Sequence, residues 1–169
     1  SKDLYKWLNR NKNVRFVETE YVNDPGRIAA IENFHAVNTA LQVNLFGESN
    51  ATMGPDGRIS SPGGQVEFMT GAARSVGGKA IIAIRSTAKN ETLSTIVLDL
   101  YKGPITTPHE SVTHVVTEYG IADLRGKSES KRAVALISVA HPKFRADLIM
   151  QALERGMISQ NEASSIPKE

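Results

Sequence analysis

The segment 60–68, SSPGGQVEF, places two glycines directly before a helical pattern. Backbone N–H groups at a helix N-terminus lack partners within the helix, and the helix dipole adds partial positive charge there. Gly63 and Gly64 have no Cβ, so the backbone leading into Gln65 can come close to a ligand. Such a loop can hold an anion, or a carbonyl oxygen that becomes negative during a reaction. The alternative is a plain turn, and neither the GxGxxG fingerprint nor a P-loop is present.

Two other polar segments follow apolar runs that are typical of buried strands. Ser86 and Lys89 follow the run 80–84, and Glu118 follows the run 112–117. In an open α/β sheet, ligands bind beyond the carboxyl ends of the strands. A lysine among small polar residues suits a phosphate or carboxylate, and a carboxylate there can act as base, nucleophile or orienting group. The alternatives are a solvated lysine and a surface or ion-paired glutamate.

Asn23 stands before Asp24 and Pro25, which form a helix-start signature. Its side chain can either cap that helix or direct its amide into a site. The four histidines, at positions 35, 109, 114 and 141, do not have the spacing of a zinc motif. Metal binding is therefore not expected.

Composition excludes several function classes. The formal net charge is only +2, and no basic block interleaved with aromatic residues suggests nucleic-acid binding. The chain has no cysteine, which excludes disulfides, thiolate nucleophiles and cysteine-bound metals within it. No apolar run approaches the roughly 18 residues of a membrane span, and a cytoplasmic protein with no membrane partner is expected.

These segments must be positioned by alternating helices and strands. Helical spacing is expected near the N-terminus (3–11), after Asp24 (25–33), after the glycine pair (65–76) and in two C-terminal segments (130–140 and 143–157). Strand patterns occupy 14–22, 34–40, 41–48, 79–86, 94–100 and 112–118. Residues 54–57 form a turn signal, and the tail from 159 onward is expected to fray. The pattern predicts a single α/β domain over residues 1–169, with a mainly parallel or mixed sheet and helices on both faces.

Three segments together resemble a known family. SPGGQVEF, STAKNETLSTIV and VTEYGIADLRGKSESKRAVALISVAHPKFRADL are similar to the C-terminal domain of the acetyl-CoA hydrolase/transferase family, over about residues 14–158. That family includes 4-hydroxybutyrate and succinyl-CoA:acetate CoA-transferases. The resemblance implies a CoA-transferase-like fold and an enzyme with two similar α/β domains, whose active site lies at their interface.

The resemblance also implies a mechanism. A glutamate attacks the acyl-CoA thioester, and CoA thiolate converts the acyl-glutamyl anhydride to a glutamyl-CoA thioester, which an acceptor carboxylate resolves. In the family this glutamate lies upstream in an HxE-type segment, which this chain lacks. We therefore expect the chain to be the C-terminal half, inactive as a transferase when isolated.

By the same resemblance, Asn23 matches the family's oxyanion asparagine. Ser61 replaces the first glycine of the GxGGQ loop, whose N–H faces the thioester oxygen, and Glu118 matches a glutamate that supports the active site without touching substrate. Coenzyme A contacts are expected from a larger set: Gly63, Gly64, Gln65, Ser86 and Lys89. The expected partners are the N-terminal half, acyl-CoA, a small carboxylate and, in the full-length enzyme, further copies in a homo-oligomer.

Other functions stay open at this point. A hydrolase of the same family would let water resolve the intermediate, and a non-catalytic module would only bind CoA or a partner chain. A sugar-phosphate isomerase of similar fold has no supporting motif. The substrate acid is not indicated by the residues.

Overall fold

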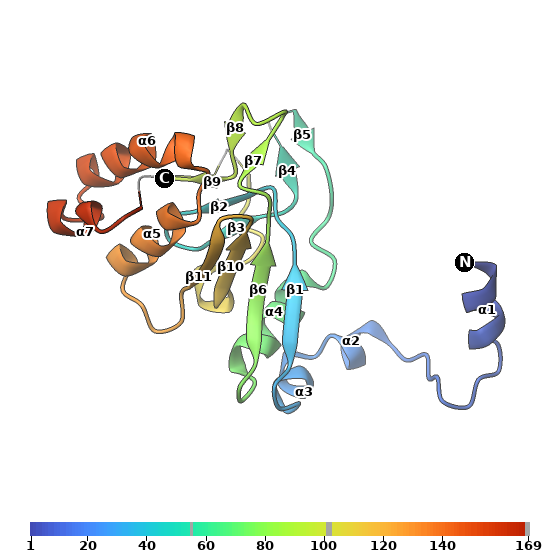
Figure 1. Ribbon diagram of the computed structural model, residues 1–169. Helices are drawn as coiled ribbons and strands as arrows, with labels where there is room; N and C mark the ends of the chain where they lie inside the picture. The colour runs from blue at the N-terminus through green and yellow to red at the C-terminus, as the bar shows by residue number, and fades with distance from the viewer. Residues whose placement is uncertain (55, 101–102, 168–169) are drawn as a thin grey trace.

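The computed structural model describes residues 1–54, 56–100 and 103–167. Its centre is a sheet with the strand order β1-β6-β10-β11, in which β1 and β10 run parallel to β6 and β11 runs antiparallel to β10 (Figure 1). The strands are β1 (His35–Asn38), β6 (Lys79–Ala83), β10 (His114–Thr117) and β11 (Gly120–Asp123). The predicted α/β class, with a mixed sheet and helices, is confirmed, although the described helices pack on one face of this sheet rather than on both.

Smaller β-elements extend from the carboxyl end of this sheet. A three-stranded sheet has the order β3-β2-β9, and two hairpins pair β4 with β5 and β7 with β8. Their bounds are β2 (Gln42–Asn44), β3 (Ser49–Asn50), β4 (Met53–Gly54), β5 (Gly57–Arg58), β7 (Thr87–Ala88), β8 (Leu93–Ser94) and β9 (Ile96–Val97). The turn expected at 54–57 joins β4 to β5, although Pro55 lies outside the described residues.

The helices among the described residues are α1 (Lys2–Leu8), α2 (Thr19–Val22), α3 (Pro25–Ala29), α4 (Gln65–Arg74), the 3₁₀ turn η1 (His109–Ser111), α5 (Glu129–Ser138), α6 (Pro142–Glu154) and α7 (Gln160–Ser164). Five of them correspond to predicted segments, mostly with shorter bounds, whereas α2, η1 and α7 were not predicted as helical. Helix α4 packs against β1, β6 and α3, whereas α5 packs against β11 and α6. Gly71 allows the close contact with α3, because a Cβ there would lie 2.5 Å from Ile28 Cβ.

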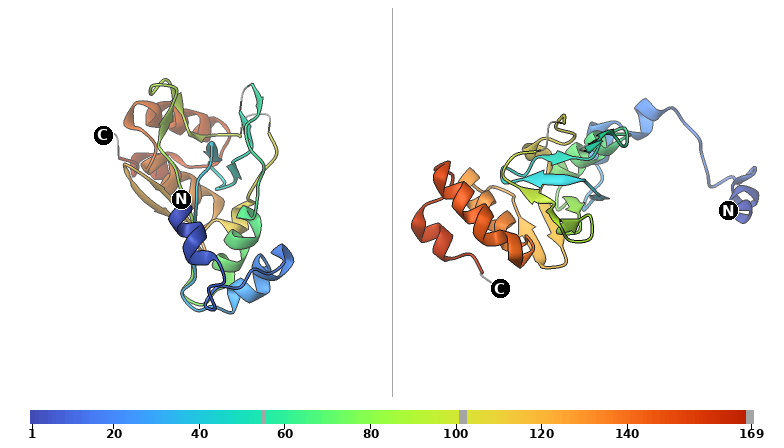
Figure 2. Two further views of the ribbon diagram at one scale, coloured as in Figure 1. Left: turned by 90° about the vertical axis from the view of Figure 1, so that its right-hand side faces the viewer. Right: turned by 90° about the horizontal axis from the view of Figure 1, so that it is seen from above.

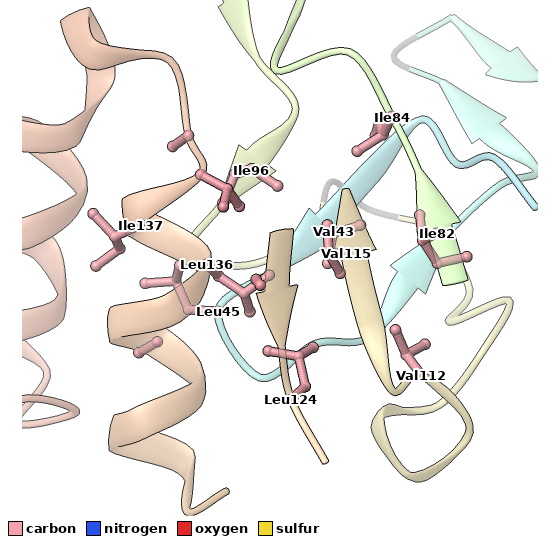
Figure 3. Close-up of a cluster of buried hydrophobic side chains, with 14 of the residues drawn as sticks. Val43, Leu45, Ile82, Ile84, Ile96, Val112, Val115, Leu124, Leu136 and Ile137 are labelled. Carbon is pink, nitrogen blue, oxygen red and sulfur yellow. The ribbon is translucent and has the colours of Figure 1, made fainter. Parts of the chain in front are cut away.

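The core lies against one face of the main sheet. Side chains on this face, among them Ala80, Ile82 and Val115, are fully buried. They join residues of α4, α5 and the small sheet in one apolar cluster. Figure 3 shows the part of this cluster that involves α5, the main sheet and the small sheet. The other face is open to solvent, since Val37 on β1 is 63% exposed and Ile121 on β11 is 68% exposed. Polar side chains share this face with them, because His35 pairs with Lys79 and His114 with Asp123 in the same registers.

The N-terminal segment stands away from the body. Figures 1 and 2 show α1 at the end of an extended stretch that leads back to α2 and α3. The strand predicted over 14–22 is wrong: residues 14–18 are extended without a ladder partner, and 19–22 form α2. A strand needs a neighbour to satisfy its backbone groups, and alternating side chains such as Phe16 cannot supply one.

The frayed tail predicted after residue 159 is also wrong for its described part. Ser159 and Glu162 form a reciprocal capping box that starts α7. Ile166 then packs into the core with 3% exposure. Residues 168 and 169 lie outside the described part of the chain. Among the described residues, none of the helices combines the length and the apolar character that crossing a bilayer requires.

The sheet core generates a stability prediction. We expect Ile82→Ala to lower the free energy of unfolding by about 2–5 kcal/mol, because it opens a cavity at a fully buried position. The matched control is Ile31→Ala, at a position that is 53% exposed, which should change it by less than about 0.5 kcal/mol. Urea unfolding of both variants measures the difference, and equal losses would contradict the assigned core.

Candidate functional site

The carboxyl ends of the three parallel strands meet at one edge of the sheet. Thr39 follows β1, Arg85 and Ser86 follow β6, and Glu118 follows β10. A hollow of about 460 Å³ at this edge is lined by Thr39, Arg85, Thr117 and Glu118, among others. The polar segments expected after β6 and β10 are therefore neighbours in space, as the strand order requires.

Ser86 and Glu118 hold each other by two hydrogen bonds. The Ser86 backbone N–H donates to Glu118 Oε2 at 2.9 Å, and Ser86 Oγ donates to Oε1 at 2.7 Å. Ser86 is fully buried, so its two donors point in a fixed direction. This bidentate arrangement ties the segment after β6 to the segment after β10.

The electrostatics favour an ionised Glu118. Desolvation acts to raise the pKa of Glu118, but hydrogen bonds from its own backbone N–H and from both Ser86 donors outweigh it, with a further contribution from the charge of Arg85. The net result is a pKa below the usual glutamate value. An ionised carboxylate that already accepts two bonds from Ser86 is better suited to orienting neighbours than to accepting a proton.

The glycine loop forms a second group with Asn23. A hollow of about 430 Å³ runs along the free edge of β1 and is lined by Asn23, Pro62, Gly64 and Gln65, together with residues 34–38 and Phe68. Asn23 does not cap α3, because Asp24 Oδ1 accepts the hydrogen bond from the Arg27 N–H at 2.6 Å. Capping was one of the two alternatives for Asn23 and is wrong; its amide is directed at the loop.

The two glycines meet different physical requirements. Gly63 has φ +55°, a left-handed conformation that glycine adopts without a steric penalty. Gly64 has an ordinary φ, but a Cβ there would lie 2.5 Å from Asn23 Nδ2. The first glycine therefore allows the turn, and the second allows the close approach of the Asn23 amide to the start of α4.

The remaining predicted residues of this loop are placed differently. Gln65 Nε2 donates to Thr107 Oγ1 at 3.0 Å, so the side chain braces the loop against a buried threonine. Ser61 is exposed, and its carbonyl oxygen accepts a bond from Ser60 Oγ at 3.2 Å. Ser61 is not among the residues that line the Asn23 hollow.

Lys89 lies at the tip of the β7–β8 hairpin, beyond Ser86. Lys89, Asn90 and Glu91 all have positive φ, between 48° and 65°, which is unusual for three consecutive residues other than glycine. They line a hollow of about 410 Å³ with Arg85. Arg85 was not predicted as a site residue, although its place at the end of an apolar strand is a usable signal.

The three hollows therefore follow one another along the sheet edge. Arg85 belongs both to the hollow with Glu118 and to the hollow with Lys89. Asn38, the last residue of β1, lines the Asn23 hollow, and Thr39, which follows it, lines that of Glu118. The arrangement offers an amide donor at one end, a fixed carboxylate in the middle and two cations beyond it. Within residues 1–54, 56–100 and 103–167, no three His, Asp or Glu side chains gather as a metal site would require.

Comparison with known proteins decides the family. Residues 1–152 match the acetyl-CoA hydrolase/transferase C-terminal domain. The chain belongs to this family. The similarity covers the glycine loop, the Ser86–Glu118 pair and Lys89 together.

Individual relatives agree with this assignment. The chain is 44% identical over 156 residues to a 4-hydroxybutyrate coenzyme A transferase of Clostridium kluyveri, covering 92% of this chain and 36% of that protein. It is 39% identical over 156 residues to a butyryl-CoA:acetate CoA-transferase of Anaerostipes caccae, covering 90% and 35%. The crystal structure of RipA from Yersinia pestis superposes with a TM-score of 0.82 at 36% identity, covering 94% of this chain and 34% of that one. The chain thus spans about a third of the length of the proteins it matches.

The Ser86–Glu118 pair generates a pH prediction. Because the folded pKa of Glu118 is lowered, its bonds contribute fully to stability above the unfolded glutamate pKa, and this contribution is lost as the pH falls through the lower folded value. Ser86→Ala removes one of the bonds that lower the pKa. We expect the free energy of unfolding to fall less steeply in this variant between about pH 5 and about pH 3.

Urea unfolding across that pH range measures the effect. The control is Ser60→Ala, an exposed serine in the loop before the glycine pair, which should reproduce the native slope. An identical slope in Ser86→Ala and the native chain would mean that the hydrogen bond does not control the titration of Glu118.

Proposed function

We propose that the chain is the C-terminal half of an acyl-CoA:carboxylate CoA-transferase, of the 4-hydroxybutyrate or acetate type, that works through a glutamyl-CoA thioester. The observation that carries the proposal is the approach of the Asn23 amide to the glycine loop at the start of α4. Membership of the family supports the reaction class, and the names of the relatives support the kind of substrate.

In this proposal the chain stabilises developing negative charge. The glutamate on the N-terminal side attacks the thioester carbonyl carbon, and the carbonyl oxygen becomes an oxyanion as the C–S bond weakens. Asn23 Nδ2 and the Ser61 backbone N–H donate hydrogen bonds to that oxygen. Departure of CoA thiolate leaves an acyl-glutamyl anhydride, and the oxygen returns to a neutral carbonyl.

The same donors serve the second half of the cycle. CoA thiolate attacks the glutamyl carbonyl of the anhydride, which releases the first carboxylate and leaves a glutamyl-CoA thioester. The acceptor carboxylate then attacks this thioester and displaces CoA thiolate, which leaves a second acyl-glutamyl anhydride. The thiolate attacks the acyl carbonyl of this anhydride, which yields the new acyl-CoA and free glutamate. Glu118 takes no proton in these steps; it fixes the loop after β6 through Ser86.

Coenzyme A contacts are assigned to the loop after β6. Arg85 and Lys89 share a hollow next to the Glu118 carboxylate, and both side chains suit the phosphates of CoA. Gly63 and Gly64 allow the pantetheine arm to pass close to the backbone, while Gln65 supports the loop from Thr107. Active enzyme in this proposal also needs the N-terminal half and assembles as a homo-oligomer in the cytoplasm.

The first prediction concerns the 169-residue chain alone. We expect no CoA exchange between acyl-CoA and acetate, because the nucleophilic glutamate is assigned to the other half. A coupled thiol assay with and without acetate measures this, and full-length protein is the positive control. Robust exchange by the isolated chain would defeat the assignment. In full-length protein, loss of thioester that is independent of acetate would instead identify a hydrolase.

The second prediction concerns the oxyanion donors in full-length enzyme. Ser61→Pro removes a backbone N–H and Asn23→Ala removes the amide, and each should lower kcat by about 10²–10³ with a smaller change in KM. Ser60→Ala, which changes the adjacent residue and keeps all backbone donors, is the matched control. A folded Ser61→Pro enzyme with the full rate would remove Ser61 from the mechanism, and the same result for Asn23→Ala would remove Asn23.

A further inference from the structure

We propose that Thr117 is a positioning residue whose hydroxyl fixes the β10–β11 turn, and with it Glu118, to the end of α5. The turn consists of Glu118 and Tyr119, because Thr117 pairs with Gly120 in the register of the two strands. The proposal concerns how Glu118 is placed rather than what the chain catalyses. It rests on the proposed function only where it predicts kinetics.

The β10–β11 turn does not determine its own geometry. Two-residue turns that match the twist of a β-hairpin need a positive φ at one or both turn residues. Neither Glu118 nor Tyr119 has a positive φ, and Gly120 follows them with φ +136°. Turns of the other types splay the two strands. The position of Glu118 therefore depends on contacts outside the turn.

Thr117 supplies such a contact through a single oxygen atom. Its Oγ1 donates a hydrogen bond to the Val139 carbonyl at 2.6 Å and accepts one from the Tyr119 N–H at 3.1 Å. Thr117 is only 8% exposed, so water has little access to either bond. The hydroxyl thus joins the inside of the turn to a residue 22 positions further along the chain.

The end of α5 is a firm reference point for this contact. Val139 is the C-cap of α5 and is 4% exposed, and its neighbours Leu136, Ile137 and Ala140 are fully buried in the core. Carbonyl groups at a helix C-terminus have no partner within the helix, so Val139 can accept the bond from Thr117. A helix end that is packed in this way cannot follow a movement of the turn.

A ring contact holds the same turn at its second residue. The Tyr119 ring meets the His141 ring edge to face, with the centroids 5.2 Å apart. The Arg145 guanidinium lies 5.6 Å from the centre of the Tyr119 ring. Tyr119 is 40% exposed, whereas Thr117 is buried, so the Thr117 hydroxyl is the anchor that solvent weakens least.

Glu118 is the residue that this anchor places. The Ile84 N–H donates to the Val116 carbonyl at 2.9 Å, which joins the end of β6 to β10 just before the two chain segments separate. Beyond this bond, the Glu118 carboxylate accepts its two hydrogen bonds from Ser86. Both bonds require the turn to stay at a fixed height above the loop after β6, and Thr117 maintains that height.

The alternative is that Thr117 serves α5 alone. Its hydroxyl satisfies a carbonyl at the helix end, and removing it would lower stability for that reason by itself. Ser138 provides a matched control, because its Oγ donates to the Val134 carbonyl at 2.8 Å, a bond within α5. Ser138→Ala removes a hydroxyl from α5 and leaves the turn anchored.

The titration of Glu118 distinguishes the two roles. Desolvation raises the pKa of Glu118, but hydrogen bonds from its own backbone N–H and from Ser86 outweigh it in the native chain. Thr117→Val removes the hydroxyl and keeps the shape of the side chain. The turn should then loosen, and the pKa of Glu118 should rise toward the ordinary glutamate value. Thr117→Ser, which keeps the hydroxyl, should retain the native pKa.

The carbon-13 shift of the Glu118 carboxyl in the labelled chain measures these values. Thr117→Ala is a second variant without the hydroxyl and cannot overpack the site, so it covers the case in which Thr117→Val does not fold. A native pKa of Glu118 in either variant would overturn the proposal, even with a loss of stability. A raised pKa in Ser138→Ala would also overturn it, because any disturbance of α5 would then suffice.

Kinetics of the full-length enzyme test the part that rests on the proposed function. The loop after β6 is assigned to coenzyme A, so Thr117→Val should raise the KM for acyl-CoA by about tenfold, with a smaller change in the KM for acetate. Thr117→Ser should restore both values. A raised pKa of Glu118 with an unchanged KM for acyl-CoA would support the positioning role of Thr117 and would remove this loop from the proposed CoA contacts.

Discussion

The parallel pairing of β6 with β1 on one side and β10 on the other is the constraint on which the rest of the structure depends. Thr113, just before β10, locks this pairing: its Oγ1 accepts from the Ala80 N–H at 2.8 Å and donates to the Ala80 carbonyl at 2.9 Å. Because these three strands run in the same direction, the segments that follow them all begin at one edge of the sheet. Ser86 and Glu118 are 32 residues apart in sequence and still meet there through two hydrogen bonds.

The main sheet has one face covered by other elements and one face open to solvent. On the covered face, α4, α5 and the small sheet bury a continuous apolar cluster. Within the described residues, β1 forms the edge of the sheet beside the Asn23 hollow, and the other face is open to solvent with both apolar and charged side chains. The chain spans about a third of its relatives, and its candidate site lies at the carboxyl ends of the parallel strands and along the edge of β1.

Local sequence patterns predicted the elements whose formation is determined by their own residues. The spacing of Met69 and Ala72 predicted α4, and the apolar run 80–84 predicted β6, although β6 buries only one of its two faces. The strand prediction over 14–22 is wrong because a strand needs a hydrogen-bonding partner, and the residues of the segment do not show whether a partner exists. Fraying of the tail was predicted from its polar composition. That prediction is wrong because Ser159 and Glu162 form a capping box and Ile166 is buried.

Residue types predicted which segments form the candidate site, but they did not predict the contacts that individual residues make there. Ser86 and Glu118 were chosen for separate reasons, and only the strand order brings them into one hydrogen-bonded pair. Gln65 was expected at the ligand, but its amide is engaged by Thr107, a contact across 42 residues that no local pattern indicates. The Asn23 side chain was expected either to cap α3 or to direct its amide into a site. Capping is excluded because the carboxylate of the neighbouring Asp24 already caps α3.

The fit between Gly64 and Asn23 restricts how these two positions can change. A methyl group at position 64 would lie within 2.5 Å of the Asn23 amide nitrogen, so the two positions are not independent although they are 41 residues apart. A lineage that acquires a side chain at 64 first must pass through a form with a displaced amide. A lineage that shortens position 23 first meets no such clash, but it gives up the amide before it can gain anything at 64. The order of the two changes therefore matters, and the glycine and the asparagine are expected to be inherited as a unit.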